Sequence, residues 1–134
     1  MITHTITIRV RYRDTDCGGV VYHSNYIDYF EWGRTELLRS KGATYRAMED
    51  DGYQLVVVDA AARYHAPSYY DDELAIETTV EEHSAVRIQF SYRIERPSDQ
   101  TLVCSGSTLL ACLDAESGRP KRLPASIQER LDSS

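Results

Sequence analysis

The stretch DTDCGGVVYHSNYIDYFEWGRTELLRSKG, residues 14–42, contains the one long helix that the sequence predicts. Residues of its buried face recur at spacings of three and four, as in an amphipathic helix; they are Tyr26, Tyr29, Phe30, Gly33, Leu37 and Leu38. We expect Ser24 or Asn25 to cap its N-terminus and Gly42 to end it. Because a glycine inside a helix costs about 1 kcal/mol relative to alanine, Gly33 is expected to allow another backbone to approach closely.

Alternating apolar and polar residues outside this stretch predict strands. Residues 5–13 alternate strictly, with Ile6, Ile8, Val10 and Tyr12 on one face, which is typical of a half-buried strand.

Two further segments, 74–80 and 86–95, show the same alternation and are joined by the short polar sequence EEHSA. They are therefore predicted to form an antiparallel hairpin. Residues 55–64 and 102–113 are apolar on both faces, which indicates strands that are covered on both sides.

The predicted order is a strand, a long helix and four more strands, with short helices at 45–50 and within 124–134. This order predicts an α+β fold in which one long helix packs on a five-stranded, largely antiparallel sheet. A length of 134 residues fits a single domain, 1–134.

Composition and charge exclude several classes of protein. With 42% hydrophobic and 27% charged residues, the chain is predicted to be a soluble globular protein. Its formal net charge of −6 would repel nucleic acid and anionic membranes, so neither is an expected partner. The best apolar run, LVVVDAAA, is short and interrupted by Asp59, and no membrane insertion is expected.

Three cysteines, Cys17, Cys104 and Cys112, occur without CxxC spacing. This pattern argues against a disulfide framework and a structural zinc site, and favours a reducing compartment. The first ten residues lack the basic and apolar regions of a signal peptide, so we predict a cytoplasmic protein. Neither a metal nor another cofactor is expected.

The loop before the long helix combines groups that suit acyl transfer. Asp14 and Asp16 follow the first strand, Gly18 and Gly19 permit a tight turn, and the helix begins shortly after them. A helix N-terminus offers free N–H groups and about half a unit of positive charge, which stabilise an oxyanion. A nearby carboxylate could attack a carbonyl carbon or activate water.

Simpler interpretations exist for each of these residues. Aspartates favour turns, so Asp14 is interpreted as a hydrogen-bonding residue that shapes the loop, and Asp16 could do the same. His23 could merely start the helix, and the DTD sequence could hold magnesium, although two acids alone are weak evidence for that.

The sequence from Asp14 to Arg39 closely resembles the signature of the hotdog-fold acyl-CoA thioesterases of the 4-hydroxybenzoyl-CoA thioesterase type. This group includes bacterial enzymes associated with the Tol-Pal envelope system. The matching positions are Gly19, Val20, Val21, Tyr22, His23, Asn25, Tyr26, Phe30, Glu31 and Arg34. The later segment RYHAPSYYDDELAIET is similar to the second conserved segment of the family.

The resemblance implies specific roles. The catalytic carboxylate corresponds to Asp16, and the backbone N–H that polarises the thioester carbonyl to His23, whose side chain belongs to the site in the Tol-Pal-like branch. Gly19, Tyr22 and Asn25 are then expected beside the oxyanion or the substrate. Family members are homodimers or dimers of dimers with interfacial active sites.

Further substrate contacts are expected away from the N-terminus of the long helix. Tyr64, Tyr69 and Tyr70 are candidates for lining the acyl pocket. Where family members that act on aromatic substrates carry a basic cluster, this chain has Ser84, Ala85 and Val86, so Arg87 is the nearby candidate for a phosphate contact.

The predicted function is hydrolysis of an acyl-CoA thioester to a free acid and coenzyme A. Two alternatives stay open: a thioesterase acting on acyl-carrier-protein substrates, and a non-catalytic acyl-CoA binding module.

Overall fold

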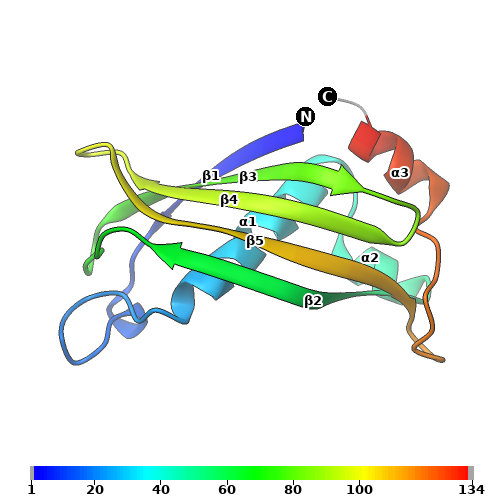
Figure 1. Ribbon diagram of the computed structural model, residues 1–134, viewed down its shortest axis with the longest axis horizontal. Coiled ribbons are helices and arrows are strands. Elements are labelled where there is room, and N and C mark those ends of the chain that lie inside the picture. Colours follow the sequence, from blue (N-terminus) through cyan, green and yellow to red (C-terminus); the bar gives the residue numbers. More distant parts are fainter. Residues whose placement is uncertain (1, 133–134) are drawn as a thin grey trace.

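A computed structural model describes residues 2–132 and has one long helix packed across one face of a five-stranded sheet (Figure 1). The elements in chain order are β1 (Ile2–Arg9), the 3₁₀ turn η1 (Tyr12–Asp14), α1 (Asn25–Ser40), α2 (Tyr45–Asp50), β2 (Tyr53–Tyr64), β3 (Glu73–His83), β4 (Arg87–Arg96), β5 (Thr101–Asp114) and α3 (Ala125–Asp132).

The sheet has the strand order β1-β3-β4-β5-β2, and each neighbouring pair is antiparallel. The α+β fold predicted from the alternation of residue types is therefore confirmed, as is the β3–β4 hairpin. The two short helices are also present; the predicted residues 133–134 of the last one lie outside the described part of the chain. None of the helices within residues 2–132 is long and apolar enough to cross a membrane.

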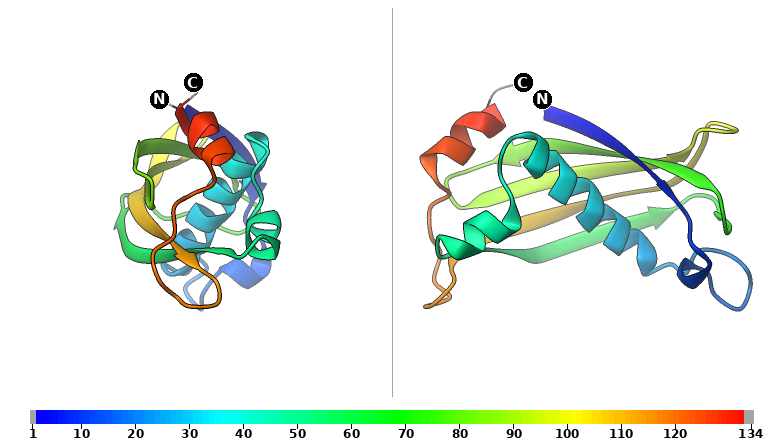
Figure 2. Two further views of the ribbon diagram at one scale, coloured as in Figure 1. Left: turned by 90° about the vertical axis from the view of Figure 1, so that its right-hand side faces the viewer. Right: turned by 180° about the vertical axis from the view of Figure 1, so that it is seen from behind.

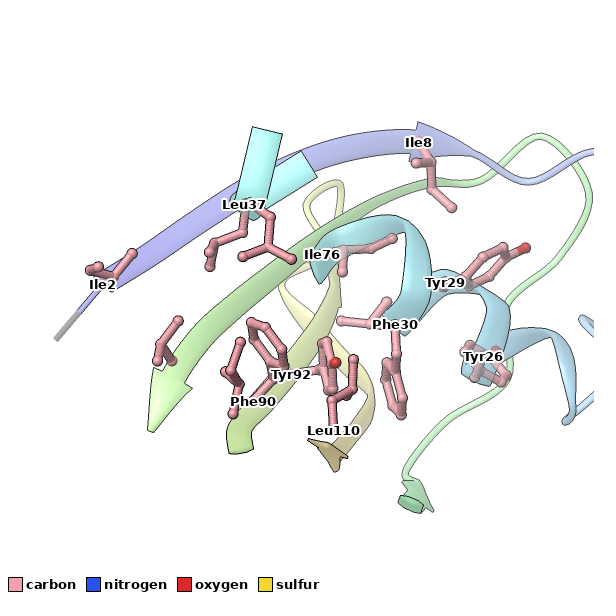
Figure 3. Packing of buried hydrophobic residues seen from close by; sticks show 14 of the residues in the cluster. Ile2, Ile8, Tyr26, Tyr29, Phe30, Leu37, Ile76, Phe90, Tyr92 and Leu110 are labelled. Carbon is pink, nitrogen blue, oxygen red and sulfur yellow. The ribbon is translucent and has the colours of Figure 1, made fainter. Parts of the chain in front are cut away.

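Aromatic stacking joins α1 to the sheet. Phe30 is fully buried and its ring stacks on that of Tyr92, with centroids 4.3 Å apart and planes at 8° (Figure 3). Gly106 of β5 makes room for this ring, because a Cβ atom there would lie 2.6 Å from Phe30 and would also collide with the Ala61 carbonyl oxygen. Such full burial of an aromatic side chain stabilises a fold by about 1.5–3 kcal/mol.

Gly33 provides a second close approach between α1 and the sheet. A Cβ atom at this position would collide with Thr78 Oγ1 and would lie 2.9 Å from Ile76 Cγ2. A neighbouring backbone was expected at Gly33, whereas the neighbours of this glycine are the side chains of two β3 residues.

The first strand is shorter than predicted. It ends at Arg9, and Tyr12 lies in the 3₁₀ turn with 77% of its surface exposed, so its predicted inward orientation is wrong. The turn forms because the Arg11 backbone N–H donates to Asp14 Oδ2 over 2.9 Å. This local hydrogen bond overrides the strand periodicity after Val10, which is still buried.

The prediction that residues 55–64 are covered on both faces is wrong for the single chain. β2 is an edge strand, with Val57 and Val58 48% and 52% exposed. A register shift between Val57 and Asp59 marks an irregularity in its pairing with β5. In contrast, β5 lies between β4 and β2 within the sheet.

Candidate active site

Three segments that are distant in sequence meet at one end of the molecule. The loop of residues 15–22, the N-terminus of α1 and the β2–β3 connection lie together, whereas α2 and α3 lie at the opposite end (Figures 1 and 2). Isolated bridges close the loop, since Thr15 pairs with Val21 and Val20 pairs with Tyr69 of the β2–β3 connection.

Asp14 anchors this loop from inside the protein. Its carboxylate accepts hydrogen bonds from the Arg11 backbone and guanidinium and from the Tyr29 hydroxyl, 3.2 Å away. Its backbone oxygen accepts from the Tyr22 N–H at 2.9 Å and from Asn25 Nδ2 at 2.7 Å. The interpretation of Asp14 as a residue that shapes the loop by hydrogen bonding fits these contacts.

The environment of Asp14 favours its charged form. Burial raises the pKa of this carboxyl, but the Arg11 backbone N–H, the Arg11 side chain and Tyr29 together lower it below its ordinary value. Burial also raises the pKa of Tyr29, as does the adjacent Asp14 carboxylate, so the Tyr29 hydroxyl keeps its proton and remains a donor.

The start of α1 differs from the predicted capping. Ser24 has helical backbone angles and its side chain makes no capping hydrogen bond. The Asn25 side chain donates to Asp14 instead of capping the helix. The Asn25 amide therefore joins the start of α1 to Asp14, whose carbonyl oxygen also accepts from the Tyr22 N–H.

Two backbone N–H groups at this helix start are free. The Tyr22 and His23 carbonyl oxygens accept from the N–H groups of Asn25 and Tyr26, at 2.9 and 3.3 Å. Within residues 2–132, however, the N–H groups of His23 and Ser24 donate no hydrogen bond. Such free donors at a helix N-terminus stabilise negative charge.

A pocket of about 300 Å³ adjoins His23, the first of these donors. Its walls come from the loop, α1 and the end of β2, and its lining residues are Val21, His23, Tyr26, Tyr64, His65, Ala66 and Pro67. The pocket is mostly apolar and aromatic, with the polar edges of His23, Tyr64 and His65. An arrangement of this kind suits an organic substrate with one polar reacting group.

Ser68 was missed by the sequence analysis although it supports the pocket. It is fully buried, its hydroxyl lies 2.6 Å from the Tyr26 hydroxyl, and its backbone oxygen accepts from the Val21 N–H. The pocket residue His65 was missed as well; its Nε2 lies 2.8 Å from Ser105 Oγ. No local pattern marks either residue, because both contact partners far away in the chain.

Asp16 lies in the exposed loop beside the helix mouth. Its Oδ1 accepts from the Gly18 N–H at 2.8 Å and from the Val20 N–H at 3.4 Å, while Oδ2 accepts no hydrogen bond within the described residues. Gly19 supports this turn with φ of +83°, a conformation that favours glycine. Asp16 does not line the pocket of the single chain.

The remaining candidates divide into two groups. Tyr22 is 46% exposed with its ring centroid 4.4 Å from that of His23, and the Tyr64 hydroxyl donates to the His23 carbonyl oxygen over 3.1 Å. Arg87, in contrast, is not brought to this site. Arg87 lies opposite Ala111 of β5, which in turn lies opposite Val56 of β2. Val56 is about 26 Å from Tyr64 along β2.

Arg87 lines a separate cavity of about 330 Å³ at the other end of the sheet, together with Glu82, His83, Ser84, Gln89 and Leu109.

A hydrogen bond from Arg34 crosses from α1 to α2. Glu31 and Arg34, three residues apart, could have paired, but the Arg34 Nε donates to the Tyr45 hydroxyl over 3.0 Å. Arg34 is buried and thereby ties α1 to α2.

Within residues 2–132 no group of three His, Cys, Asp or Glu side chains could hold a metal ion. The three cysteines are free thiols, with Cys17 exposed and the other two buried.

The chain is similar in sequence and fold to known thioesterases. An acyl-CoA thioester hydrolase, YbgC, from Escherichia coli O6:H1 is 36% identical over 120 residues, which are 90% of this chain and 89% of that protein. The crystal structure of a DHNA-CoA thioesterase from Staphylococcus aureus superimposes with a TM-score of 0.92 at 31% identity, covering 99% of this chain and 90% of the other.

A chloroplast acyl-acyl carrier protein thioesterase of Arabidopsis thaliana is 27% identical over 128 residues, 96% of this chain and 67% of that protein. The profile of the thioesterase-like superfamily matches residues 10–131, a span that includes Asp14, the helix mouth and every strand after the first. The predicted resemblance to hotdog thioesterases is confirmed, and the chain belongs to the thioesterase-like superfamily.

Proposed function

We propose that this protein hydrolyses acyl-CoA thioesters to a carboxylic acid and free coenzyme A. The observation that carries the proposal is a pair of backbone N–H groups, at His23 and Ser24, that donate no hydrogen bond within residues 2–132. His23 lines an aromatic pocket, and both residues follow the loop that bears Asp16. The names of its relatives in Escherichia coli and Staphylococcus aureus support the same reaction.

In the proposed mechanism, the thioester carbonyl oxygen accepts a hydrogen bond from the His23 backbone N–H at the electropositive start of α1. The negative charge that develops on this oxygen in the transition state is then stabilised by a donor that needs no reorganisation. The His23 side chain, which lines the pocket, and Tyr22, whose ring contacts it, are proposed to border the substrate.

Asp16 supplies the second half of the mechanism, in one of two ways. As a nucleophile it forms a bond to the thioester carbon, the C–S bond breaks, and water then cleaves the mixed anhydride. As a general base it removes a proton from the attacking water. In both routes the thiolate of coenzyme A leaves and the net reaction consumes one water.

The free Oδ2 of Asp16 supports either role, because Oδ1 is already held by the loop. Gly19 and Asn25 act on this arrangement indirectly: Gly19 permits the turn, and Asn25 fixes the loop to the helix through Asp14.

The proposed active form is a homodimer, or a dimer of dimers, built on the exposed edge of β2. This edge carries apolar residues, including the half-exposed Val57 and Val58, and among the described residues 2–132 the strand pairs only with β5. Antiparallel pairing of two β2 strands would bring the start of one strand beside the end of the other. The partner subunit's Arg87 would then come to the Tyr64 end of this chain, where it could contact a phosphate of coenzyme A.

Asp16→Asn tests the proposed mechanism. We expect kcat to fall at least about 100-fold, because the amide can neither attack nor accept a proton, while the fold is retained. Thiol release from a panel of acyl-CoA esters is measured with a chromogenic disulfide and corrected for the protein's own exposed Cys17. The matched control is Asp50→Asn, an exposed carboxylate on α2 at the far end of the molecule, which should keep full activity.

Full turnover by Asp16→Asn would remove Asp16 from the mechanism. Saturable binding of acyl-CoA without thiol release by the native protein would instead support the non-catalytic binding module.

The carrier-protein alternative is supported by the Arabidopsis thaliana relative. The net charge of −6 argues against it, because carrier proteins are generally acidic and would be repelled. Comparison of kcat/KM for one acyl chain on coenzyme A and on a carrier protein separates the two substrates, and we expect coenzyme A to be preferred.

A further inference from the structure

Tyr64, the last residue of β2, contacts the residues at the start of α1. Its hydroxyl donates to the His23 carbonyl oxygen over 3.1 Å, a contact between residues 41 positions apart. Its ring lies against those of His23 and Tyr26, with centroid distances of 6.1 and 5.6 Å. We propose that Tyr64 is a positioning residue that aims the backbone donors of the oxyanion site, an inference that rests on the proposed thioesterase function.

The geometry of the peptide unit explains how Tyr64 would act. In a trans peptide the C=O and N–H groups point in opposite directions and are rigidly connected. The peptide unit between His23 and Ser24 carries the His23 oxygen and the Ser24 N–H. A hydrogen bond from Tyr64 to that oxygen therefore fixes the direction of the free Ser24 N–H, which becomes a second oxyanion donor beside His23.

The start of α1 needs such support. Within residues 2–132 the Ser24 side chain makes no capping hydrogen bond, and the Tyr26 N–H reaches the His23 carbonyl oxygen at 3.3 Å. This is a long hydrogen bond, so the first turn alone holds the His23–Ser24 peptide weakly. Tyr64 adds a second donor to the His23 oxygen and approaches it from a different element.

The direction of the Tyr64 hydroxyl separates this role from substrate binding. The ring lines the pocket, whereas the hydroxyl points to a backbone oxygen. Removal of the hydroxyl leaves the ring and the shape of the pocket in place. It should therefore weaken the stabilisation of the transition state without weakening binding of the ground state.

Tyr64→Phe tests this inference in the acyl-CoA assay. We expect kcat to fall about five- to tenfold, as for the loss of one hydrogen bond, with KM unchanged within about twofold. The control is Tyr12→Phe: Tyr12 is 77% exposed and its hydroxyl makes no hydrogen bond within residues 2–132, so both constants should be unchanged. The melting temperatures of both variants should match the native protein within about 3 °C.

Amide NMR provides a readout that does not depend on turnover. The ¹⁵N–¹H resonances of Ser24 and Tyr26 should shift in Tyr64→Phe and stay in place in Tyr12→Phe. A Tyr64→Phe variant with native kcat, or with unshifted Ser24 resonances, would overturn the positioning role and leave the proposed thioesterase intact. A native protein that releases no thiol from any acyl-CoA would overturn the proposed function itself, and with it the catalytic value of this contact.

Discussion

Two aspartates separated by a single threonine have opposite environments in this protein. Asp14 is 6% exposed and surrounded by donors from the turn, the loop and α1, whereas Asp16 is exposed and leaves one oxygen free. The difference follows from the η1 turn, which directs the Asp14 side chain inward. Asp16 comes after the turn and lies in the exposed loop. A structural acid and a candidate catalytic acid thus share one short motif.

Asp14→Asn is expected to destabilise the protein by about 1–3 kcal/mol at pH 7, because a buried charge-assisted network is broken. The pKa of Asp14 in the folded state is lowered, so its stabilising contribution is present above the unfolded pKa of about 3.9 and is lost as the pH falls through the folded value. The difference in unfolding free energy between native protein and variant should therefore shrink below about pH 4.

Urea denaturation at pH 7 and at pH 3 measures this difference, with Asp50→Asn as the exposed control. A difference that stays constant between the two pH values would show that the charge of Asp14 does not contribute.

At the scale of elements, α1 does two tasks at once. Its buried face packs on the sheet through Phe30, Gly33 and Leu37, of which Figure 3 shows Phe30 and Leu37. Its first turn lines the pocket through Tyr26. The close helix–sheet contact at Gly33 fixes the height of the helix above the sheet. The position of the helix mouth is therefore set by packing about two turns away.

Gly33→Ala tests this contact. Alanine favours a helix interior by about 1 kcal/mol over glycine, but the added methyl group collides with Thr78 Oγ1 and crowds Ile76. We expect the collision to dominate and the unfolding free energy to fall by about 1–3 kcal/mol.

The double variant Gly33→Ala/Thr78→Ala removes the nearest colliding atom, and the Thr78 hydroxyl has no hydrogen-bond partner within residues 2–132. A double-mutant cycle measured by chemical denaturation should show recovery of about 1 kcal/mol or more. Strict additivity would mean that the collision is relieved elsewhere.

For the whole molecule, the two edges of the sheet differ. The β1 edge carries threonines and Arg9, which pairs with Asp71 and Glu73, whereas the β2 edge exposes valines and alanines. An unpaired apolar strand edge is a template for pairing with another chain. This difference favours β2 over β1 as the contact between two copies.

Val57→Lys should therefore shift the protein from a dimer or tetramer towards the 15.3 kDa monomer. A two-fold interface contains each substitution twice, and we expect the dissociation constant to rise at least about 100-fold. Sedimentation velocity over a concentration series measures the change, and Thr7→Lys on the β1 edge is the matched control. A native protein that sediments at 15.3 kDa at all concentrations would contradict the proposed assembly.

The amino-acid pattern alone predicted the strands, the long helix and the loop motif, because the period of apolar residues and the turn chemistry act within a few positions of the chain. It misjudged the end of β1, where the hydrogen bond between Arg11 and Asp14 competes with strand pairing. It also suggested Asn25 as a helix-capping residue, but the Asn25 side chain donates to the Asp14 carbonyl oxygen instead.

The packing of the complete chain was needed to show that β2 lies at the edge of the sheet, that Arg87 is remote from the pocket, and that Tyr64 and Ser68 contact residues at the start of α1. The Tyr64–His23 and Ser68–Tyr26 contacts join residues 41 and 42 positions apart. A periodic pattern shows which face of a strand is apolar but not which strand lies beside it. Contacts between residues so far apart in the sequence depend on how the complete sheet packs against α1.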